Sequence, residues 1–450
     1  MKFFTRDRAF YGTFFPLLII IALQQLISLG VNLADNLMLG FYSESALAGA
    51  AIVNQLHFIL AQLIIGIAAG TVVLGSQYWG KGETEPIKRI IALGLKLSLL
   101  FGAIFWAVTL VIPAEVLRLL TTDETIIAEG VVYLKVMSWT YIIFSLSYVL
   151  MLSLEAVQTA IVGVVMSVAA LVINVVLNYC LIFGNFGFPR LGITGAAIAT
   201  LVSRIAELAI ILLYLFAIDR KLRIRLRDLI TLDLTYLRRF IRVALPTIIA
   251  GAQWGVAQTA QTAILGHISA TAIAANSIAI VIFELFAIFG MCCSSAASVT
   301  IGKAVGAGNL DKIRPYSRTL QAIFIAIGVI SGAMIFAFKD VFVALYAVTP
   351  ETRTMAVQFL TVLAVSTVGT CYEFPVESGI IAGGGDTKYA SIVDVSFMWL
   401  FTIPSAALSA FVFKFPPMAT FCFLKADQLL KCIPNAIRCN RYKWVRQLTK

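Results

Sequence analysis

Long stretches without a charged side chain dominate the chain. The four longest cover residues 9–34, 45–80, 156–189 and 243–283. Each exceeds the ~20 residues that an α-helix needs to cross the hydrocarbon core of a bilayer. The last stretch has room for two helices joined by a tight turn at residues 266–269. This pattern predicts an all-α protein that crosses a membrane many times.

The ends of the apolar tracts predict twelve membrane-spanning helices in two groups of six. The twelfth is the weakest, because Lys425, Asp427 and Lys431 interrupt its apolar sequence. The first six are expected near residues 14–39, 46–78, 90–112, 130–152, 158–183 and 192–218, and the last six near 243–265, 271–302, 316–338, 354–380, 389–412 and 415–436.

The two groups repeat each other at a shift of 226 residues. A repeat of this length in an apolar chain predicts two six-helix lobes, residues 1–218 and 243–450, joined by the charged linker 219–242. Two tandem bundles that rock about a shared site are the organisation of many secondary transporters, so the repeat indicates transport across a bilayer. The positions that recur in register include Leu39 and Leu265, Gly40 and Gly266, Ala46 and Ala272, Ile52 and Ile278, Gly80 and Gly306, and Gly82 and Gly308.

Composition and charge fit the same class. The chain is 60% hydrophobic and only 13% charged, with a formal net charge of +11, whereas soluble proteins are about 25% charged. Most basic residues fall on the side of the N-terminus, which predicts cytoplasmic termini and a cytoplasmic linker in the plasma membrane. The basic run 220–227 is either an amphipathic segment on anionic lipid or a linker made basic to hold the topology. Topology accounts for the charge, so no nucleic-acid partner is expected.

Motifs for catalysis or ATP hydrolysis are missing from the sequence. There is no P-loop and no G-x-S-x-G motif, and two histidines are too few for a histidine-based metal centre. The seven cysteines lack C-x-x-C spacing and fall mostly in apolar tracts, where we interpret them as small hydrophobic residues. We therefore expect no enzyme and no cofactor, with an ion gradient as the source of energy.

Polar residues inside the predicted helices are candidates for ion coupling, because each is costly to insert into a bilayer. Asp35 lies in the first helix, Asn174 and Asn178 share one face of the fifth, and Thr200 lies in the sixth. All four are expected at a similar depth. A carboxylate, two amide oxygens and a hydroxyl suit Na⁺, and the acid alone suits a proton. The alternative is that the asparagines and the threonine only hold helices together by hydrogen bonds.

Four polar residues of the second half are candidates for a substrate cavity. Gln261 is the repeat counterpart of the first-helix aspartate, so the two lobes differ in charge at this point. Glu373 and Glu377 are four residues apart on one face and form a second cation-attracting patch. Glu284 is an acid in the eighth helix. For Glu377, near the cytoplasmic end, snorkelling or pairing with a lysine is the alternative.

Four segments together resemble the multidrug and toxic compound extrusion (MATE) family along essentially the whole chain. They are Ala-Asp-Asn-Leu-Met-Leu-Gly at residues 34–40, Phe-Gly-Phe-Pro-Arg-Leu-Gly-Ile-Thr-Gly-Ala-Ala-Ile-Ala-Thr-Leu-Val-Ser-Arg at 186–204, Ile-Gly-Lys-Ala-Val-Gly-Ala-Gly at 301–308, and Gly-Gly-Asp-Thr-Lys at 384–388. The resemblance implies a V-shaped protein of twelve helices that exchanges Na⁺ or H⁺ for organic, often cationic, compounds.

The resemblance also implies roles for the candidate residues. In the family a first-helix acid and polar residues of the fifth and sixth helices bind the coupling cation, and these roles fall on Asp35, Asn174, Asn178 and Thr200. Some members carry an acid in the seventh helix, whereas residues 246–258 here contain none. Coupling through the second lobe is therefore in doubt.

We expect a monomeric secondary antiporter that exports amphipathic, cationic organic compounds in exchange for Na⁺ or H⁺ by alternating access. Its partners are the small organic cargo and the lipid bilayer. The alternative is a flippase for a lipid-linked saccharide, from the wider group of related transporters. A buried basic patch in the central cavity would favour the flippase, because its cargo carries a pyrophosphate.

Overall fold

The computed structural model describes residues 4–231, 233–346 and 348–449. Within these ranges the chain is helical and contains no β-strand. Eleven of the described helices are long and apolar enough to cross a membrane. The expectation of an all-α membrane protein is therefore confirmed.

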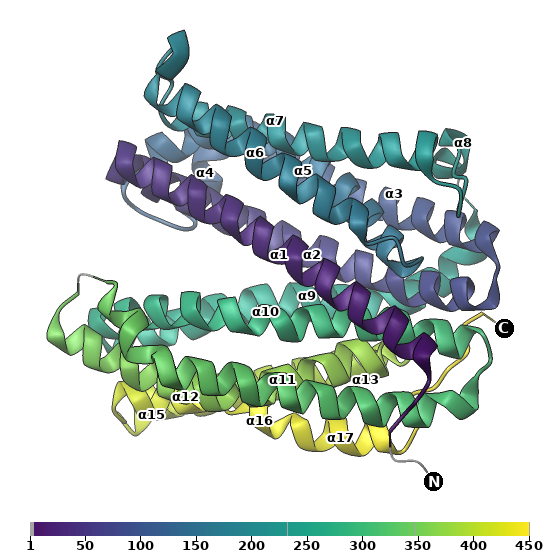
Figure 1. The fold of residues 1–450 in the computed structure, drawn as a ribbon. Helices are drawn as coiled ribbons and strands as arrows, with labels where there is room; N and C mark the ends of the chain where they lie inside the picture. Colours follow the sequence, from purple (N-terminus) through teal and green to yellow (C-terminus); the bar gives the residue numbers. More distant parts are fainter. Residues whose placement is uncertain (1–3, 232, 347, 450) are drawn as a thin grey trace. The chain divides into compact units, whose positions relative to one another are not determined.

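The first half of the chain contains six of these long helices (Figure 1). Short helices α4 (Pro113–Arg118), η1 (Asn185–Gly187) and α8 (Leu226–Ile230) lie between or after them. The long ones are α1 (Arg8–Tyr42), α2 (Glu44–Lys81), α3 (Thr84–Val111), α5 (Glu124–Ala156), α6 (Ile161–Phe183) and α7 (Ile193–Leu213), which continues as η2 (Tyr214–Ile218).

The second half contains the other five long helices, two of which are built from several helical segments. They are α9 (Leu234–Ile268), α10 (Ala270–Gly306), α11 (Leu310–Ala344), α12 (Pro350–Phe374) with η3 (Pro375–Ile381), and the run of α13 (Thr387–Ser396), η4 (Phe397–Thr402), α14 (Ile403–Ala407) and η5 (Leu408–Val412).

The last predicted helix, residues 415–436, is not continuous. It consists of α15 (Pro417–Lys425), α16 (Asp427–Leu430) and α17 (Cys432–Asn440), separated at Ala426 and Lys431. The charged residues that weaken its apolar pattern coincide with these breaks. The expected twelfth helix is therefore present as three consecutive helical segments, and Ala426 and Lys431 between them keep helical backbone angles.

Several other helix boundaries differ from the sequence prediction, and those around α9 differ the most. The helix expected to begin at residue 243 begins at Leu234, so part of the basic linker is helical. The expected turn at residues 266–269 shrinks to Ser269, because α9 continues to Ile268. The hydroxyl of Ser269 accepts a hydrogen bond from the Ala272 backbone N–H at 3.0 Å, which caps α10.

The chain forms two compact units. The C-unit comprises the residues up to Leu18, Ser76–Gly82 and Ile249 onward, and the N-unit comprises Ile19–Gly75 and Glu83–Ile248. Three of the unit boundaries thus fall within α1, α2 and α9, and the fourth lies between α2 and α3. The domain boundaries inferred from the repeat, at residues 218 and 243, stay a prediction.

Small residues allow close helix packing in the N-unit. Gly66 and Gly70 of α2 lie against the backbone of Ile248 and Ala244 in α9, where a Cβ atom would clash. The hydroxyl of Thr247 donates to the Gly66 carbonyl at 2.7 Å. Elsewhere α5, α6 and α7 lie side by side (Figure 1). Such contacts matter in lipid, because the lipid tails are as apolar as the side chains and no hydrophobic force drives the helices together.

The C-unit is built around α10, α11 and α12, which pack against one another. The rings of Phe359 in α12 and Phe421 in α15 stack with centroids 4.1 Å apart. Both side chains are fully buried. This stacking fixes the broken last helix against the core, even though its own sequence is interrupted by charges.

Candidate ion and cargo sites

The four predicted ion-coupling residues come together in the N-unit. Asn178 donates to the Asp35 carboxylate at 2.5 Å and lies 3.0 Å from the Asn174 side-chain oxygen. Asn174 in turn lies 3.5 Å from the Thr200 hydroxyl. A chain of polar contacts therefore connects α1, α6 and α7.

Helix packing explains why Asp35 reaches α6. Gly163 of α6 lies directly against the Gln24 side chain of α1, so a side chain at this position would keep the helices apart. The Ser28 and Ser167 hydroxyls, also on α1 and α6, are 3.2 Å apart. The two helices are thus held close along successive turns, and Asp35 continues the same face of α1.

One oxygen of this site lacks a partner. Asn174 and Asn178 are both fully buried. Within the described ranges, the side-chain oxygen of Asn178 has no hydrogen-bond donor. Burying a carbonyl oxygen without a hydrogen-bond partner costs free energy. Such an oxygen can bind a hard cation or accept a hydrogen bond from a protonated group.

The surroundings of the site include two groups that were not predicted as site residues. Tyr133 of α5 is buried and its side chain contacts that of Thr200. Arg204, one turn after Thr200, pairs with Glu207 at 2.8 Å and acts electrostatically on Asp35. The spacing of Thr200, Arg204 and Glu207 along one helix face was the available signal for this arrangement.

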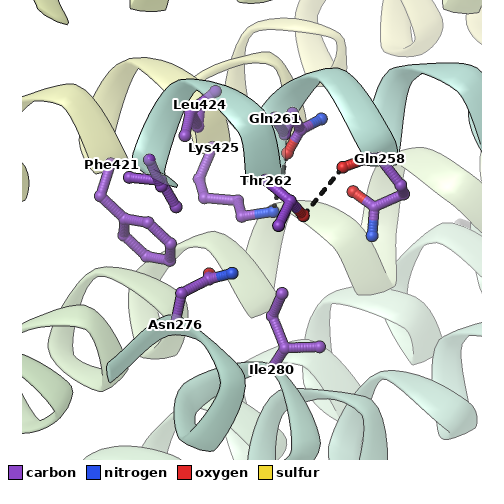
Figure 2. A pocket seen from close by; sticks show the side chains of 9 residues that line it. Gln258, Gln261, Thr262, Asn276, Ile280, Phe421, Leu424 and Lys425 are labelled. Atoms are coloured by element: carbon purple, nitrogen blue, oxygen red, sulfur yellow. Dashed lines mark hydrogen bonds between the residues drawn. The ribbon is translucent and has the colours of Figure 1, made fainter. Parts of the chain in front are cut away.

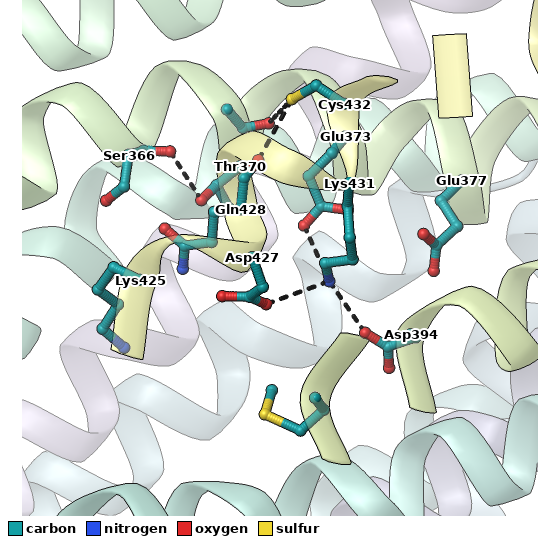
Figure 3. A network of polar contacts seen from close by, with 12 residues as sticks. Ser366, Thr370, Glu373, Glu377, Asp394, Lys425, Asp427, Gln428, Lys431 and Cys432 are labelled. Atoms are coloured by element: carbon teal, nitrogen blue, oxygen red, sulfur yellow. Dashed lines mark hydrogen bonds and ion pairs between the residues drawn. The ribbon is translucent and has the colours of Figure 1, made fainter. Parts of the chain in front are cut away.

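The C-unit contains a second polar cluster, which is organised around a lysine (Figure 3). The ammonium group of Lys431 lies 3.0 Å from Asp394, 3.4 Å from Glu373 and 3.5 Å from Asp427. Lys431, Glu373 and Asp427 are buried. Three carboxylates from α12, α13 and α16 thus surround a cation that the chain itself supplies.

The four candidate cavity residues do not form one cluster. Glu373 belongs to the lysine network, and buried Glu377 accepts a hydrogen bond from Asn435 at 2.7 Å. Glu284 is exposed on α10. Gln261 accepts a hydrogen bond from Lys425 at 3.2 Å.

Gln261 and Lys425 line a small pocket of about 10 Å³ in the C-unit (Figure 2). Gln258, Thr262 and Asn276 complete its polar lining. The space is enough for one water molecule. Lys425 is itself buried, and no described carboxylate lies within 4 Å of its ammonium group.

Sequence reasoning missed most of the basic side of these clusters. Lys425 and Lys431 lie in the interrupted last helix, where we interpreted the charges as a weakness of the span and considered pairing with a lysine only as an alternative for Glu377; Asn435 lies in the same segment. The i,i+4 spacing of Asp427 and Lys431 was a usable signal, because such a pair neutralises itself on one helix face.

The described part of the chain has eleven helices long and apolar enough to cross a membrane, with polar side chains held between them, an arrangement typical of membrane transporters. A family model, MatE, matches residues 21–180 and 246–408. The chain therefore belongs to the MATE family of efflux transporters.

Relatives and solved structures agree with this assignment. The chain is 24% identical over 388 residues to the probable multidrug resistance protein NorM of Listeria monocytogenes, covering 85% of this chain and 84% of that one. It is 20% identical to the uncharacterized transporter YisQ of Bacillus subtilis, covering 92% and 90%.

Two solved structures share the fold. A mutant of the MATE transporter VcmN of Vibrio cholerae superimposes with a TM-score of 0.88 at 16% identity, covering 98% of each chain. A MOP superfamily transporter of Pyrococcus furiosus gives 0.87 at 19% identity, covering 97% and 96%. The binding pocket of that archaeal protein is described as having reversed polarity, which suggests a different function for it.

Proposed function

We propose that this transporter is a secondary antiporter that exports amphipathic organic cations in exchange for Na⁺ or H⁺. It acts by alternating access as a monomer in the plasma membrane, with both termini in the cytoplasm. Multidrug resistance proteins among its relatives support drug efflux as the general activity. The proposal adds the coupling ion, the charge of the cargo, the monomeric state, the plasma membrane and the orientation of the termini.

The observation that carries the proposal is the polar site of the N-unit. Asp35 has two buried amides beside it, the Thr200 hydroxyl contacts one of them, and the Asn178 oxygen has no donor within the described part of the chain. Na⁺ would take oxygens from Asp35, Asn174, Asn178 and Thr200, the hard ligands it prefers. A proton would instead sit on the Asp35 carboxylate.

Coupling follows from the cost of charge in the membrane. An ionised Asp35 is tolerated only beside a cation or oriented dipoles. Binding of Na⁺ or H⁺ neutralises it, which favours closer packing of α1, α6 and α7. A cationic cargo in the N-unit would lose its electrostatic partner and its space at the same time. Ion entry would therefore promote cargo release.

The arrangement of the C-unit supports coupling through the N-unit alone. There the acids Glu373, Asp394 and Asp427 already have the ammonium group of Lys431 within 4 Å. A second exchangeable cation would have to compete with a tethered one. The candidate cavity residues of the C-unit are accordingly assigned no coupling role in this mechanism.

One observation favours the alternative, a flippase for a lipid-linked saccharide. Lys425 is buried beside Gln261, and among the described residues no carboxylate forms an ion pair with it. A buried unpaired ammonium group attracts an anionic cargo rather than a cationic one. A single lysine is weaker support than the complete N-unit site, so we rank the flippase second.

Transport in proteoliposomes separates these functions. Vesicles loaded with Na⁺, or made acidic inside, should accumulate external tetraphenylphosphonium when diluted into neutral, Na⁺-free buffer. Asp35→Asn should reduce accumulation to that of protein-free vesicles. The control Asp340→Asn, which removes a carboxylate that is 69% exposed, should transport like wild type.

The same assay identifies which part of the proposal is wrong. Accumulation that neither gradient changes would rule out ion-coupled antiport. Transport of an anionic pyrophosphate-linked lipid probe, with no transport of the cation, would instead favour the flippase.

A further inference from the structure

A strongly basic pocket lies in the N-unit, away from the ion site. Its volume is about 600 Å³. Lys88 and Arg89 contribute from the first turns of α3, and Arg223, Arg225 and Arg227 contribute from the chain before and within α8. Two segments that are more than 130 residues apart thus bring five cations to one cavity.

The acids of the pocket leave most of this charge uncompensated. Glu85 is 2.5 Å from the ammonium group of Lys88. Asp228 accepts a hydrogen bond from the backbone N–H of Arg225 at 2.9 Å, so it faces the main chain. Within the described ranges, no carboxylate forms an ion pair with the guanidinium groups that line the pocket.

Alternation along residues 222–227 explains how the arginines reach one cavity. Leu222 and Ile224 are buried, whereas Arg223, Arg225 and Arg227 are exposed. The apolar side chains fix the segment on the protein, and the basic ones project from its other side. The residue after α8 is also held in place, because the Lys96 ammonium group donates a hydrogen bond to the Thr231 carbonyl at 2.6 Å.

A second feature of this region points to lipid rather than to a soluble ligand. Leu226 and Ile230 lie one turn apart on α8 and are 61% and 67% exposed. Ile218, at the end of the preceding membrane helix, is 58% exposed. An apolar edge beside a basic pocket, at the ends of spanning helices, matches the boundary between acyl chains and head groups.

We propose that this pocket binds the phosphate group of an anionic phospholipid. Arginine suits this role, because its planar guanidinium group donates two parallel hydrogen bonds to phosphate oxygens. Leu226 and Ile230 contact the acyl chains of the same lipid. Bound lipid would hold the start of α3 against the α8 segment and neutralise their mutual repulsion.

Lipid retention by the purified full-length protein tests the proposal. The protein is incubated in mixed micelles that contain equal amounts of phosphatidylglycerol and phosphatidylcholine, and bound lipid is counted by native mass spectrometry. Wild type should retain phosphatidylglycerol preferentially. Replacing Arg223, Arg225 and Arg227 by Gln should reduce its affinity roughly 100-fold, at about 1 kcal/mol for each basic residue.

The control removes the same charge elsewhere. Arg8, Arg441 and Lys443 are exposed residues of the C-unit, and their triple replacement by Gln should leave retention unchanged. Replacing the three pocket arginines by Lys keeps the charge but loses the paired hydrogen bonds, so this variant should bind phosphatidylglycerol more tightly than the Gln variant and less tightly than wild type. This set separates a local site from general attraction, and the Lys variant also reports whether the segment still folds.

Two results would overturn the proposal. One is equal loss of phosphatidylglycerol from the pocket variant and from the control, which would mean that only net charge matters. The other is binding of soluble glycerol phosphate or inorganic phosphate as tightly as the lipid, which would assign the pocket to a free phosphate compound.

Discussion

Gly80 of α2 and Gly306 of α10 each pack against the backbone of the other helix. A Cβ atom at Gly80 would collide with the Lys303 carbonyl, and one at Gly306 would collide with the Gln77 carbonyl. Both pairs, Gly80 with Gly306 and Gln77 with Lys303, are related by the same shift of 226 residues. The contact is thus reciprocal between the two repeats, within the C-unit.

This crossing predicts a large cost for the smallest possible side chain. Gly80→Ala and Gly306→Ala should each lower the free energy of unfolding by about 1–3 kcal/mol, because a methyl group forces the two backbones apart. The measurement is thermal unfolding in detergent. Gly12→Ala is the matched control, since nothing lies within 4 Å of a Cβ atom there. Equal stability of all three variants would mean that the crossing is not tightly packed.

Sequence pattern and repeat were sufficient for the fold class and for most helices. The N-unit site was also accessible, because depth and the i,i+4 spacing select Asp35, Asn174 and Asn178 from a few intramembrane polar residues. The structure adds their contacts and the unsatisfied Asn178 oxygen. Their role in ion coupling stays a prediction.

The ion pairs of Lys431 could not be predicted from the sequence, for a physical reason. A charge in an apolar tract costs free energy unless a partner compensates it. For Lys431 two of the partners, Glu373 and Asp394, come from other helices. Tertiary pairing of this kind leaves no periodic signal in a single sequence, so the tract looked only interrupted.

Replacing Lys431 should lower the stability of the protein, because Glu373, Asp394 and Asp427 then lack a compensating cation. Lys431→Met is expected to destabilise the protein by about 3–5 kcal/mol, because buried carboxylates lose their cation. Adding Glu373→Gln, Asp394→Asn and Asp427→Asn should restore much of the loss. Thermal unfolding in detergent measures both, with exposed Lys443→Met as control. A fully stable single variant would show that the acids are neutral or hydrated without Lys431.

A carboxylate at the N-terminus should make stability depend on pH. Hydrogen bonds from Tyr316 and Lys312, at 2.6 and 2.9 Å, lower the pKa of Asp7 from 3.8 to about 2. Its contribution is therefore complete above pH 4 and is lost as the pH falls from about 4 to 2.

Asp7→Asn should reveal this contribution directly. The variant should be less stable than wild type at neutral pH by roughly 1 kcal/mol, since partial exposure screens the interaction. The difference should vanish near pH 2. Asp311→Asn, which removes an exposed acid close by, should show no such trend. A constant gap between wild type and Asp7→Asn across this range would exclude titration of Asp7 as its cause.

Neutral ligands of the ion site should matter less than the acid. Asn178→Ala removes one amide oxygen but leaves Asp35, so cation affinity should fall roughly tenfold rather than disappear. The measurement is the Na⁺ or H⁺ concentration that gives half-maximal tetraphenylphosphonium uptake in proteoliposomes. Asn54→Ala, which removes an exposed amide of α2, serves as control and should leave the half-maximal concentration unchanged. An unchanged half-maximal concentration in Asn178→Ala would exclude Asn178 as a ligand.

The last prediction concerns the link between ion and cargo. If neutralisation of Asp35 drives release, saturating ion must weaken drug binding, and saturating drug must weaken ion binding by the same factor. The variant Asp35→Asn resembles the neutralised state, so its drug affinity should be low and should no longer respond to the ion. Equilibrium binding of tetraphenylphosphonium in detergent, measured across Na⁺ concentration and pH, tests this. The ion whose concentration shifts wild-type affinity is then the coupling ion. Drug affinity that responds to neither ion would mean that ion binding does not drive cargo release.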